Sequence, residues 1–306
     1  MTQLSVIFLG TGGSWPTVKR SVTSIAVKRG SDIILFDCGE GTQRQFQKSN
    51  LSYMQIRHIF ISHFHGDHFL GLPGLIQTMQ LNDREEPLHI YGPPGMHQLL
   101  QQLVSLGYFK PNYEIVSHEI QPKETLHFDG YSISTLKVSH GIPSYAYKLK
   151  EDKRPGKFDK PKALGLGIPE GPLFGKLQKG EQIQLDDGRT FSPEDVMGPK
   201  RPGRSIVYSG DTRILPEMID FSKGADVLIH EATYSSELED LAYQYGHSTA
   251  KQAATLAKKA DVKSLYLVHI SPRYLDIKPL IVEARKIFPH CFLPNDLEET
   301  EISLKK

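Results

Sequence analysis

The sequence has little of what would assign it to a specialised class of protein. Only 2 of its 306 residues are cysteine, which excludes a fold held together by disulfides. No apolar run approaches the ~20 residues of a membrane-spanning helix, and the first ten residues read as a strand without the basic stretch of a signal peptide. The 36 basic and 35 acidic side chains nearly cancel, so the overall charge favours no class of partner. We therefore expect a globular protein of the reducing cytoplasm that does not associate with membranes.

Short apolar runs and amphipathic segments alternate along most of the chain. Their patterns predict strands at residues 4–9, 24–27, 33–36, 56–61, 88–91, 113–116, 131–138, 205–209, 226–230 and 264–268. They predict helices at residues 41–48, 72–81, 96–106, 215–222, 250–260 and 278–288. This interleaving indicates a mixed α/β fold, organised as one domain over residues 1–306.

Residues 148–204 interrupt this alternation. They contain 16 glycines and prolines in 57 residues, against 46 in all 306. Between residues 148 and 179, nine basic side chains accompany four acidic ones, a local charge of +5 in a chain whose total is +1. A long stretch without periodicity is either a functional insertion or a flexible surface loop, and composition leaves both interpretations open.

Histidine is abundant, with 13 copies, and several of them are concentrated in one segment. The sequence Ser62-His63-Phe64-His65-Gly66-Asp67-His68 offers four metal ligands within six residues. Neutral imidazole and carboxylate groups suit Zn²⁺ and similar first-row metals. One tetrahedral ion does not easily take all four from so short a loop and keep a position for water, whereas two ions can share them. The segment therefore predicts a centre with two ions.

Three further candidate ligands, His140, Asp211 and His269, each follow the end of a predicted strand. Ligand-type residues just past strand ends are expected to converge on one edge of a sheet. The alternative for each is an ordinary core or surface residue. We favour that alternative for six other histidines, namely His58, His89, His97, His118, His127 and His290.

Seven more stretches carry a resemblance to a known family: residues 8–13, 36–43, 71–75, 210–212, 230–233, 246–250 and 271–274. With the His-x-His-x-Asp-His motif, they make the chain resemble the ribonuclease Z family nearly end to end. These are tRNA 3′-processing endonucleases of the metallo-β-lactamase superfamily. The resemblance implies a four-layer αββα sandwich with a protruding Gly/Pro-rich basic arm, contained in the insertion 148–204.

The resemblance also implies two Zn²⁺ ions per subunit, with Mn²⁺ or another divalent ion as the alternative. One ion would be held by His63, His65 and His140. The other would be held by Asp67, His68 and His269, with Asp211 bridging the two. A shared hydroxide would be the nucleophile and Asp67 its proton acceptor, roles that agree with the known chemistry of two-metal sites.

His247 and Glu231 are the remaining acid–base candidates. A departing ribose 3′-oxygen needs a proton, which a histidine can donate, and a carboxylate can orient that imidazole. The alternative makes Glu231 a structural support and leaves His247 as the residue before a helix cap. Asp37 is expected to brace the loop near the metals.

Four basic residues are candidates for contact with RNA: Arg273, Lys160, Lys162 and Lys176. Arg273 follows His269 closely and could pair with a phosphate or a terminal base, although an ordinary surface arginine is the alternative. The resemblance implies that the three lysines lie on an arm that grips precursor tRNA, in a homodimer where the arm could reach RNA held by the partner.

The resulting prediction is an endonuclease that removes 3′ trailers from tRNA precursors, leaving a 3′-hydroxyl on the tRNA and a 5′-phosphate on the trailer. A small-molecule hydrolase on the same fold, acting on an ester, a lactone or an arylsulfate, would need the same ligands. A zinc-stabilised RNA-binding protein without turnover is a third interpretation, although a structural site closes its coordination instead of keeping a position for water.

Overall fold

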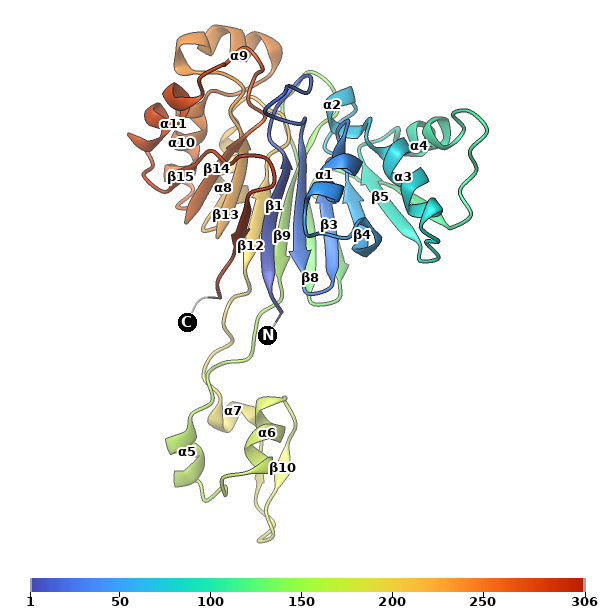
Figure 1. Cartoon of the computed structure of the whole chain (residues 1–306). Coiled ribbons are helices and arrows are strands. Elements are labelled where there is room, and N and C mark those ends of the chain that lie inside the picture. The colour runs from blue at the N-terminus through green and yellow to red at the C-terminus, as the bar shows by residue number, and fades with distance from the viewer. Residues whose placement is uncertain (1, 305–306) are drawn as a thin grey trace. The chain divides into compact units, whose positions relative to one another are not determined.

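Two mixed sheets of seven strands each form the centre of the computed structural model, which describes residues 2–304 (Figure 1). The strand order in the first sheet is β16 (Glu299–Glu301), β1 (Leu4–Gly10), β2 (Ser24–Arg29), β3 (Asp32–Phe36), β4 (Ile56–Phe60), β5 (Leu88–Gly92) and β6 (Ile115–Glu119). The order in the second is β15 (Cys291–Phe292), β14 (Ser264–Val268), β13 (Val227–Glu231), β12 (Ser205–Tyr208), β9 (Tyr145–Glu151), β8 (Tyr131–Lys137) and β7 (Thr125–Phe128).

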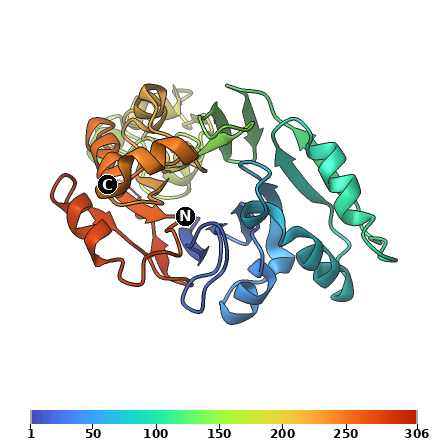
Figure 2. The same cartoon turned by 90° about the horizontal axis from the view of Figure 1, so that it is seen from above.

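The two sheets face each other across a buried apolar core to which both contribute, as with Phe36 of β3 and Tyr208 of β12. The outer face of the first sheet is covered by helices α1 (Thr42–Lys48), α3 (Leu72–Leu81) and α4 (Met96–Val104). The outer face of the second is covered by α8 (Pro216–Ser222), α10 (Ala250–Lys259) and α11 (Lys278–Arg285). Figure 2 shows these helices outside the sheets. The predicted αββα sandwich is therefore confirmed.

Local sequence explains several of these elements. Helix α10 begins at a capping box, because the Thr249 side chain accepts from the Gln252 amide and the Gln252 side chain accepts from the Thr249 amide. Its alanines pack on the second sheet, in agreement with the helix predicted there. The strand predicted at residues 113–116 begins instead at Ile115, because Tyr113 turns into the helical layer and donates its hydroxyl to the Ile76 carbonyl. None of the helices within residues 2–304 is long and apolar enough to cross a membrane.

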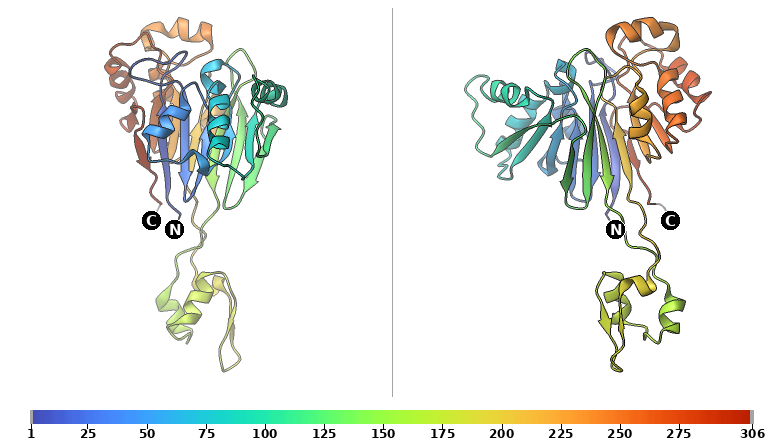
Figure 3. Two further views of the ribbon diagram at one scale, coloured as in Figure 1. Left: turned by 45° about the vertical axis from the view of Figure 1, so that its right-hand side comes forward. Right: turned by 180° about the vertical axis from the view of Figure 1, so that it is seen from behind.

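The strand directions bring several loops to one end of the sandwich. Strands β3, β4 and β5 are parallel, and so are β12, β13 and β14. Phe36 pairs with Phe60 at the carboxyl ends of β3 and β4, and Glu231 pairs with Val268 at the carboxyl ends of β13 and β14. The loops that follow these strands therefore begin at the same end of each sheet. The short helices α2 (Gly66–Phe69) and α9 (Glu239–Tyr245) lie at this end in every side view (Figure 3). Two 3₁₀ turns, η1 (Tyr53–Gln55) and η2 (Ser236–Leu238), complete the connections.

Residues Lys150–Arg204 form a separate compact unit, called the 150–204 unit below. It contains helices α5 (Lys160–Gly165), α6 (Pro172–Gln178) and α7 (Pro193–Val196) and the hairpin of β10 (Ile183–Gln184) with β11 (Thr190–Phe191). These elements enclose a small apolar core that includes Phe174, Leu177 and Val196. This segment is therefore folded, although its sequence shows no apolar periodicity. Its elements are too short for a periodic pattern, and each helix begins with a proline in its first turn.

Candidate metal centre

The histidine-rich segment lies in the loop after β4, where the buried Asp37 carboxylate holds it. Asp37 Oδ1 accepts from the Ser62 amide at 2.6 Å, and Oδ2 accepts from the Ser62 hydroxyl at 2.7 Å. Asp37 Oδ2 lies 2.7 Å from His68 Nδ1 and also accepts from the Tyr208 hydroxyl at 2.5 Å. Asp37 has a positive φ of 57°, a backbone conformation that is uncommon for residues other than glycine. The expected bracing role of Asp37 is thus confirmed, and it ties both sheets to the loop.

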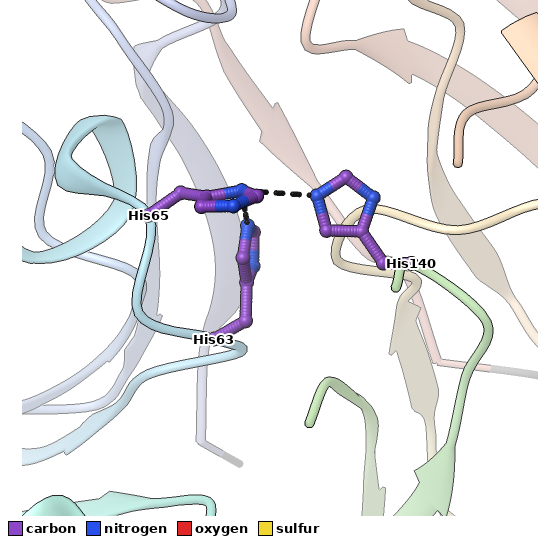
Figure 4. Close-up of side chains that lie close together, drawn as sticks. All are labelled: His63, His65 and His140. Carbon is purple, nitrogen blue, oxygen red and sulfur yellow. Dashed lines mark hydrogen bonds between the residues drawn. The ribbon is translucent and has the colours of Figure 1, made fainter. Parts of the chain in front are cut away.

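Three histidines converge at one side of the centre (Figure 4). His65 Nδ1 lies 3.0 Å from His63 Nε2 and 3.1 Å from His140 Nε2. His63 comes from the loop after β4 in the first sheet, whereas His140 comes from the loop after β8 in the second. Their ligand nitrogens all lie within 4.8 Å of one another, a spacing that allows one ion to contact all three.

A second group, of Asp67, His68 and His269, lies beside the first. Asp67 Oδ2 is 3.2 Å from His269 Nε2 and 3.6 Å from His68 Nε2. His269 has a φ of 57°, and its ring lies so close to Gly13 that a Cβ there would be 2.5 Å from the imidazole. The close approach of the 10–13 loop therefore requires glycine at this position.

Asp211 lies between the two groups. Its Oδ2 is 3.1 Å from His269 Nε2 and 3.3 Å from His68 Nε2. The same oxygen is 3.7 Å from the Nε2 atoms of His63 and His140. One carboxylate therefore faces four imidazoles, two from each group, and all seven residues named as ligands from the sequence lie in one cluster.

Four of the five candidate imidazole ligands are oriented by hydrogen bonds to Nδ1, on the side of the ring away from the centre, whereas His65 turns Nδ1 toward the other two histidines of its group. Nδ1 of His68 faces Asp37 at 2.7 Å, and Nδ1 of His140 faces the Gly246 carbonyl at 2.8 Å. Nδ1 of His63 faces the Ser62 hydroxyl at 3.0 Å, and Nδ1 of His269 faces the Thr233 hydroxyl at 2.8 Å. A ring that donates from Nδ1 presents the unprotonated Nε2 to the centre, which is the state that binds a metal.

The residues present fit a divalent cation. Within the described part of the chain, His68 Nε2 and Asp211 Oδ1 are buried without a hydrogen-bond partner, which is costly unless something else pairs with them. Burial opposes ionisation of Asp211, but His269 and His68 outweigh it and hold the pKa of this carboxyl well below its usual range. The site thus combines imidazole nitrogens with carboxylates that stay negative, a donor set that suits zinc and similar ions.

His247 and Glu231 form a pair at the edge of the same cluster. His247 Nδ1 lies 2.9 Å from Glu231 Oε1, and Glu231 is fixed by the Thr212 amide at 2.9 Å and the Thr233 hydroxyl at 2.7 Å. The His247 ring lies 4.8 Å from that of His140, centroid to centroid. Burial alone would lower the pKa of His247, but the Glu231 carboxylate more than offsets this and raises the pKa to about 9.

The predicted RNA contacts lie in different settings. Arg273 is exposed near the centre, with its guanidinium 5.0 Å from the centroid of the Tyr234 ring. Lys160, Lys162 and Lys176 are exposed on α5 and α6 of the 150–204 unit. Lys160 pairs with Glu170 at 2.5 Å.

Apart from Asp37, the sequence did not identify the residues that support the ligands, above all Ser62 and Thr233, which contact ligand imidazoles, and Tyr208, which contacts Asp37. Ser62 and Thr233 lie inside motifs that were singled out, so their positions offered a signal. Tyr208 reaches Asp37 across 171 residues of sequence, and no local pattern indicates that contact.

Comparisons with known proteins agree with this geometry. The family model described as "Beta-lactamase superfamily domain" matches residues 188–270, and that described as "Anti-Pycsar protein Apyc1" matches residues 4–154. Among solved structures, human tRNase Z, short form, is 27% identical with a TM-score of 0.73, covering 98% of this chain and 100% of that chain. YhfI from Bacillus subtilis, a metallo-β-lactamase fold protein 19% identical, covers 98% of this chain and 100% of its own with a TM-score of 0.72, and supports the fold alone.

Curated relatives match over nearly their entire lengths. Ribonuclease Z of Methanosarcina acetivorans is 46% identical over 300 residues, 98% of each chain. Ribonuclease Z of Pyrococcus horikoshii is also 46% identical, over 98% of this chain and 96% of its own. With this identity across the whole sequence, and with the ligand cluster intact, the chain belongs to the ribonuclease Z family.

Proposed function

We propose that this protein is a zinc-dependent endonuclease that removes 3′ trailers from tRNA precursors. The products are a tRNA with a 3′-hydroxyl and a trailer with a 5′-phosphate. The observation that carries the proposal is the buried cluster of seven candidate ligands around Asp211, in a chain of the ribonuclease Z family. The solved tRNase Z that resembles this chain supports tRNA as the RNA that is cut.

Two divalent ions fit the two groups of ligands. His63, His65 and His140 would hold one, Asp67, His68 and His269 the other, and Asp211 would contact both. Such a pair of ions supplies Lewis-acid chemistry, because it activates water near neutral pH and stabilises the charge that develops on a phosphoryl group.

The protein's own acid–base groups would act on the attacking water molecule and on the departing ribose 3′-oxygen. Asp67 accepts from the Ser14 amide at 2.6 Å, so its carboxylate is fixed to orient a water molecule and take its proton. His247 keeps a proton near neutral pH because its pKa is raised to about 9 by Glu231. It would donate that proton to the departing ribose 3′-oxygen, and Glu231 would keep the ring in position.

RNA recognition is assigned to exposed positive charge. Lys160, Lys162 and Lys176 of the 150–204 unit would contact phosphates on folded tRNA, which binds by shape and charge instead of sequence. Arg273 would contact the RNA near the cut. The proposal includes a homodimer and a cytoplasmic location, the latter in keeping with two cysteines that are free and buried.

The test is to map the products of a 3′-labelled tRNA precursor at nucleotide resolution. We expect one cut at the 3′ edge of the acceptor stem, a tRNA fragment that poly(A) polymerase can extend, and a trailer whose 5′ end is sensitive to phosphatase. Cuts at many positions, or a 2′,3′-cyclic phosphate on the tRNA fragment, would contradict the proposal. Turnover of esters or lactones with no cut in the RNA would favour a small-molecule hydrolase.

A further inference from the structure

An exposed tyrosine lies close to the metal centre and has no role in the function proposed above. Tyr243, on α9 at the loop end of the sandwich (Figure 1), is 70% exposed. The Arg213 guanidinium lies 4.9 Å from the centroid of its ring, and Arg213 Nε donates to the Tyr243 carbonyl at 2.7 Å. The ring is therefore held in place by a cation while most of its surface remains in solvent.

This pair is connected to the ligands through a few backbone contacts. Arg213 follows Asp211 by two residues, and its amide donates at 2.8 Å to the carbonyl of Ser139, the residue before His140. On the other side, the Tyr243 carbonyl accepts from the Gly246 amide, and the Gly246 carbonyl faces Nδ1 of His140 at 2.8 Å. The tyrosine is thus placed by the same segment that orients a candidate ligand.

A groove of about 660 Å³ begins at His140 and Ser139. Lys123 and Lys137, both exposed, line it together with the loop 141–143 and Glu217. Two lysines against one glutamate give this surface a positive charge, which suits a phosphodiester backbone. Because Arg213 Nη1 also reaches the Ser139 hydroxyl at 3.4 Å, the stacked pair borders the groove.

We propose that Tyr243, stacked on Arg213, is a platform for the base of an unpaired nucleotide that flanks the scissile phosphate, and that the groove takes the adjoining backbone. An exposed aromatic ring beside basic side chains is the usual arrangement for binding single strands without reading their sequence. Such a platform would hold the strand while its phosphate lies at the metal centre. The inference rests on the proposed function, since it assumes an RNA substrate, but it assigns a positioning residue that the reaction itself does not require.

The test compares Tyr243→Ala, Tyr243→Phe and Tyr243→Trp with the wild type in single-turnover cleavage of a tRNA precursor. Tyr243→Ala should lower kcat/KM about 5- to 150-fold, the effect of losing one stacked base. Phe and Trp keep an aromatic face and should retain activity within a factor of a few. Tyr108→Ala is the matched control, because Tyr108 is fully exposed on the loop after α4 and should show no loss.

Precursors with an abasic site distinguish stacking from a structural role. The base is removed at one unpaired position at a time, on either side of the cut. At one of these positions, removal of the base should lower kcat/KM of the wild type by the same factor as Tyr243→Ala lowers it on the intact precursor. On that abasic substrate, kcat/KM of Tyr243→Ala should fall no further.

Two results would overturn the inference while leaving the proposed function intact. One is equal cleavage of the intact precursor by Tyr243→Ala and the wild type. The other is a kcat/KM that is lower in Tyr243→Ala than in the wild type by the same factor on every abasic substrate, which is expected if the tyrosine only supports Arg213. An intact precursor left uncut by the wild type would instead overturn the proposed function, and this inference with it.

Discussion

The metal centre and the 150–204 unit use charged side chains in opposite ways. In the centre, the carboxylates of Asp37 and Glu231 are buried, and each is fixed by several hydrogen bonds. In the 150–204 unit, Lys160, Lys162 and Lys176 are exposed, and Lys160 pairs with Glu170 at the surface. Fixed, dehydrated groups suit chemistry that depends on exact geometry, whereas exposed cations suit recognition of an extended anion.

The unit also contains a buried ion pair. Arg204 donates from Nε and from Nη2 to the two oxygens of Glu151, both at 2.7 Å, at the point where the chain enters and leaves the unit. This bidentate contact joins the two ends of the segment. We therefore expect that substitutions in the metal centre lower catalysis without weakening RNA binding, and that changes in the 150–204 unit do the reverse.

The largest effect is expected from Asp67→Ala. Loss of this carboxylate should lower kcat roughly 10²- to 10⁴-fold on any phosphodiester, because both its contact with the centre and its acid–base role disappear. RNA affinity, measured by filter binding, should stay near that of the wild type. Asp129→Ala, at an exposed acid in the turn between β7 and β8, is the control and should leave both quantities unchanged. Undiminished cleavage by Asp67→Ala would remove Asp67 from the mechanism.

Replacement of most of the 150–204 unit by a short turn should weaken RNA binding and leave hydrolysis of a small phosphodiester intact. Arg154 and Arg201 exchange backbone hydrogen bonds of 2.8 and 2.9 Å, so an Asn-Gly turn in place of residues 155–200 closes the chain as a hairpin. Losing a second site of contact should weaken tRNA binding roughly 10²-fold or more. Hydrolysis of bis(p-nitrophenyl) phosphate should be retained. Unchanged tRNA affinity would show that the unit is not the RNA-binding arm.

Thr233→Val tests whether the groups behind the ligands matter. The substitution keeps the shape of the side chain but removes the hydroxyl that faces His269 and Glu231. Metal affinity should fall roughly 10- to 100-fold, as for other residues that orient a ligand. Competition with a chromophoric chelator measures this directly, and Thr233→Ser should restore the affinity. An unaltered affinity in Thr233→Val would mean that His269 is held by other contacts.

The smallest effects are expected from single lysines of the unit. Lys176→Ala should reduce the slope of log binding constant against log salt concentration by about 1, the signature of one lost phosphate contact. Lys160→Ala should reduce the slope by less, because Lys160 is already paired with Glu170. Equal slopes for both variants and the wild type would exclude these lysines from the RNA contact.

Much of the centre could be predicted from the sequence because its ligands sit in short motifs or directly after strands. His63, His65, Asp67 and His68 are adjacent in sequence, and the parallel strands β13 and β14 bring Glu231 and His269 to one edge. The groups that hold the ligands were less visible. Tyr208 and Asp37 meet only because the two sheets face each other, and such a contact depends on tertiary packing.

The 150–204 unit could not be predicted in the same way. Its helices span only four to seven residues, so no apolar period can develop in them. Glycines and prolines that suggest a loop in fact begin and end these short elements. The apolar residues of the segment, such as Phe174 and Leu177, were the signal that a small core forms there.

Metal-dependent cleavage at the buried centre is tested most directly by metal removal and return. The protein is treated with EDTA, its metal content is measured by elemental analysis, and a 3′-labelled tRNA precursor is added before and after titration with Zn²⁺. We expect no cut by the metal-free protein, and the single cut at the acceptor stem to return as zinc approaches two ions per chain. A cut at that position by protein shown to be free of metal would contradict this account.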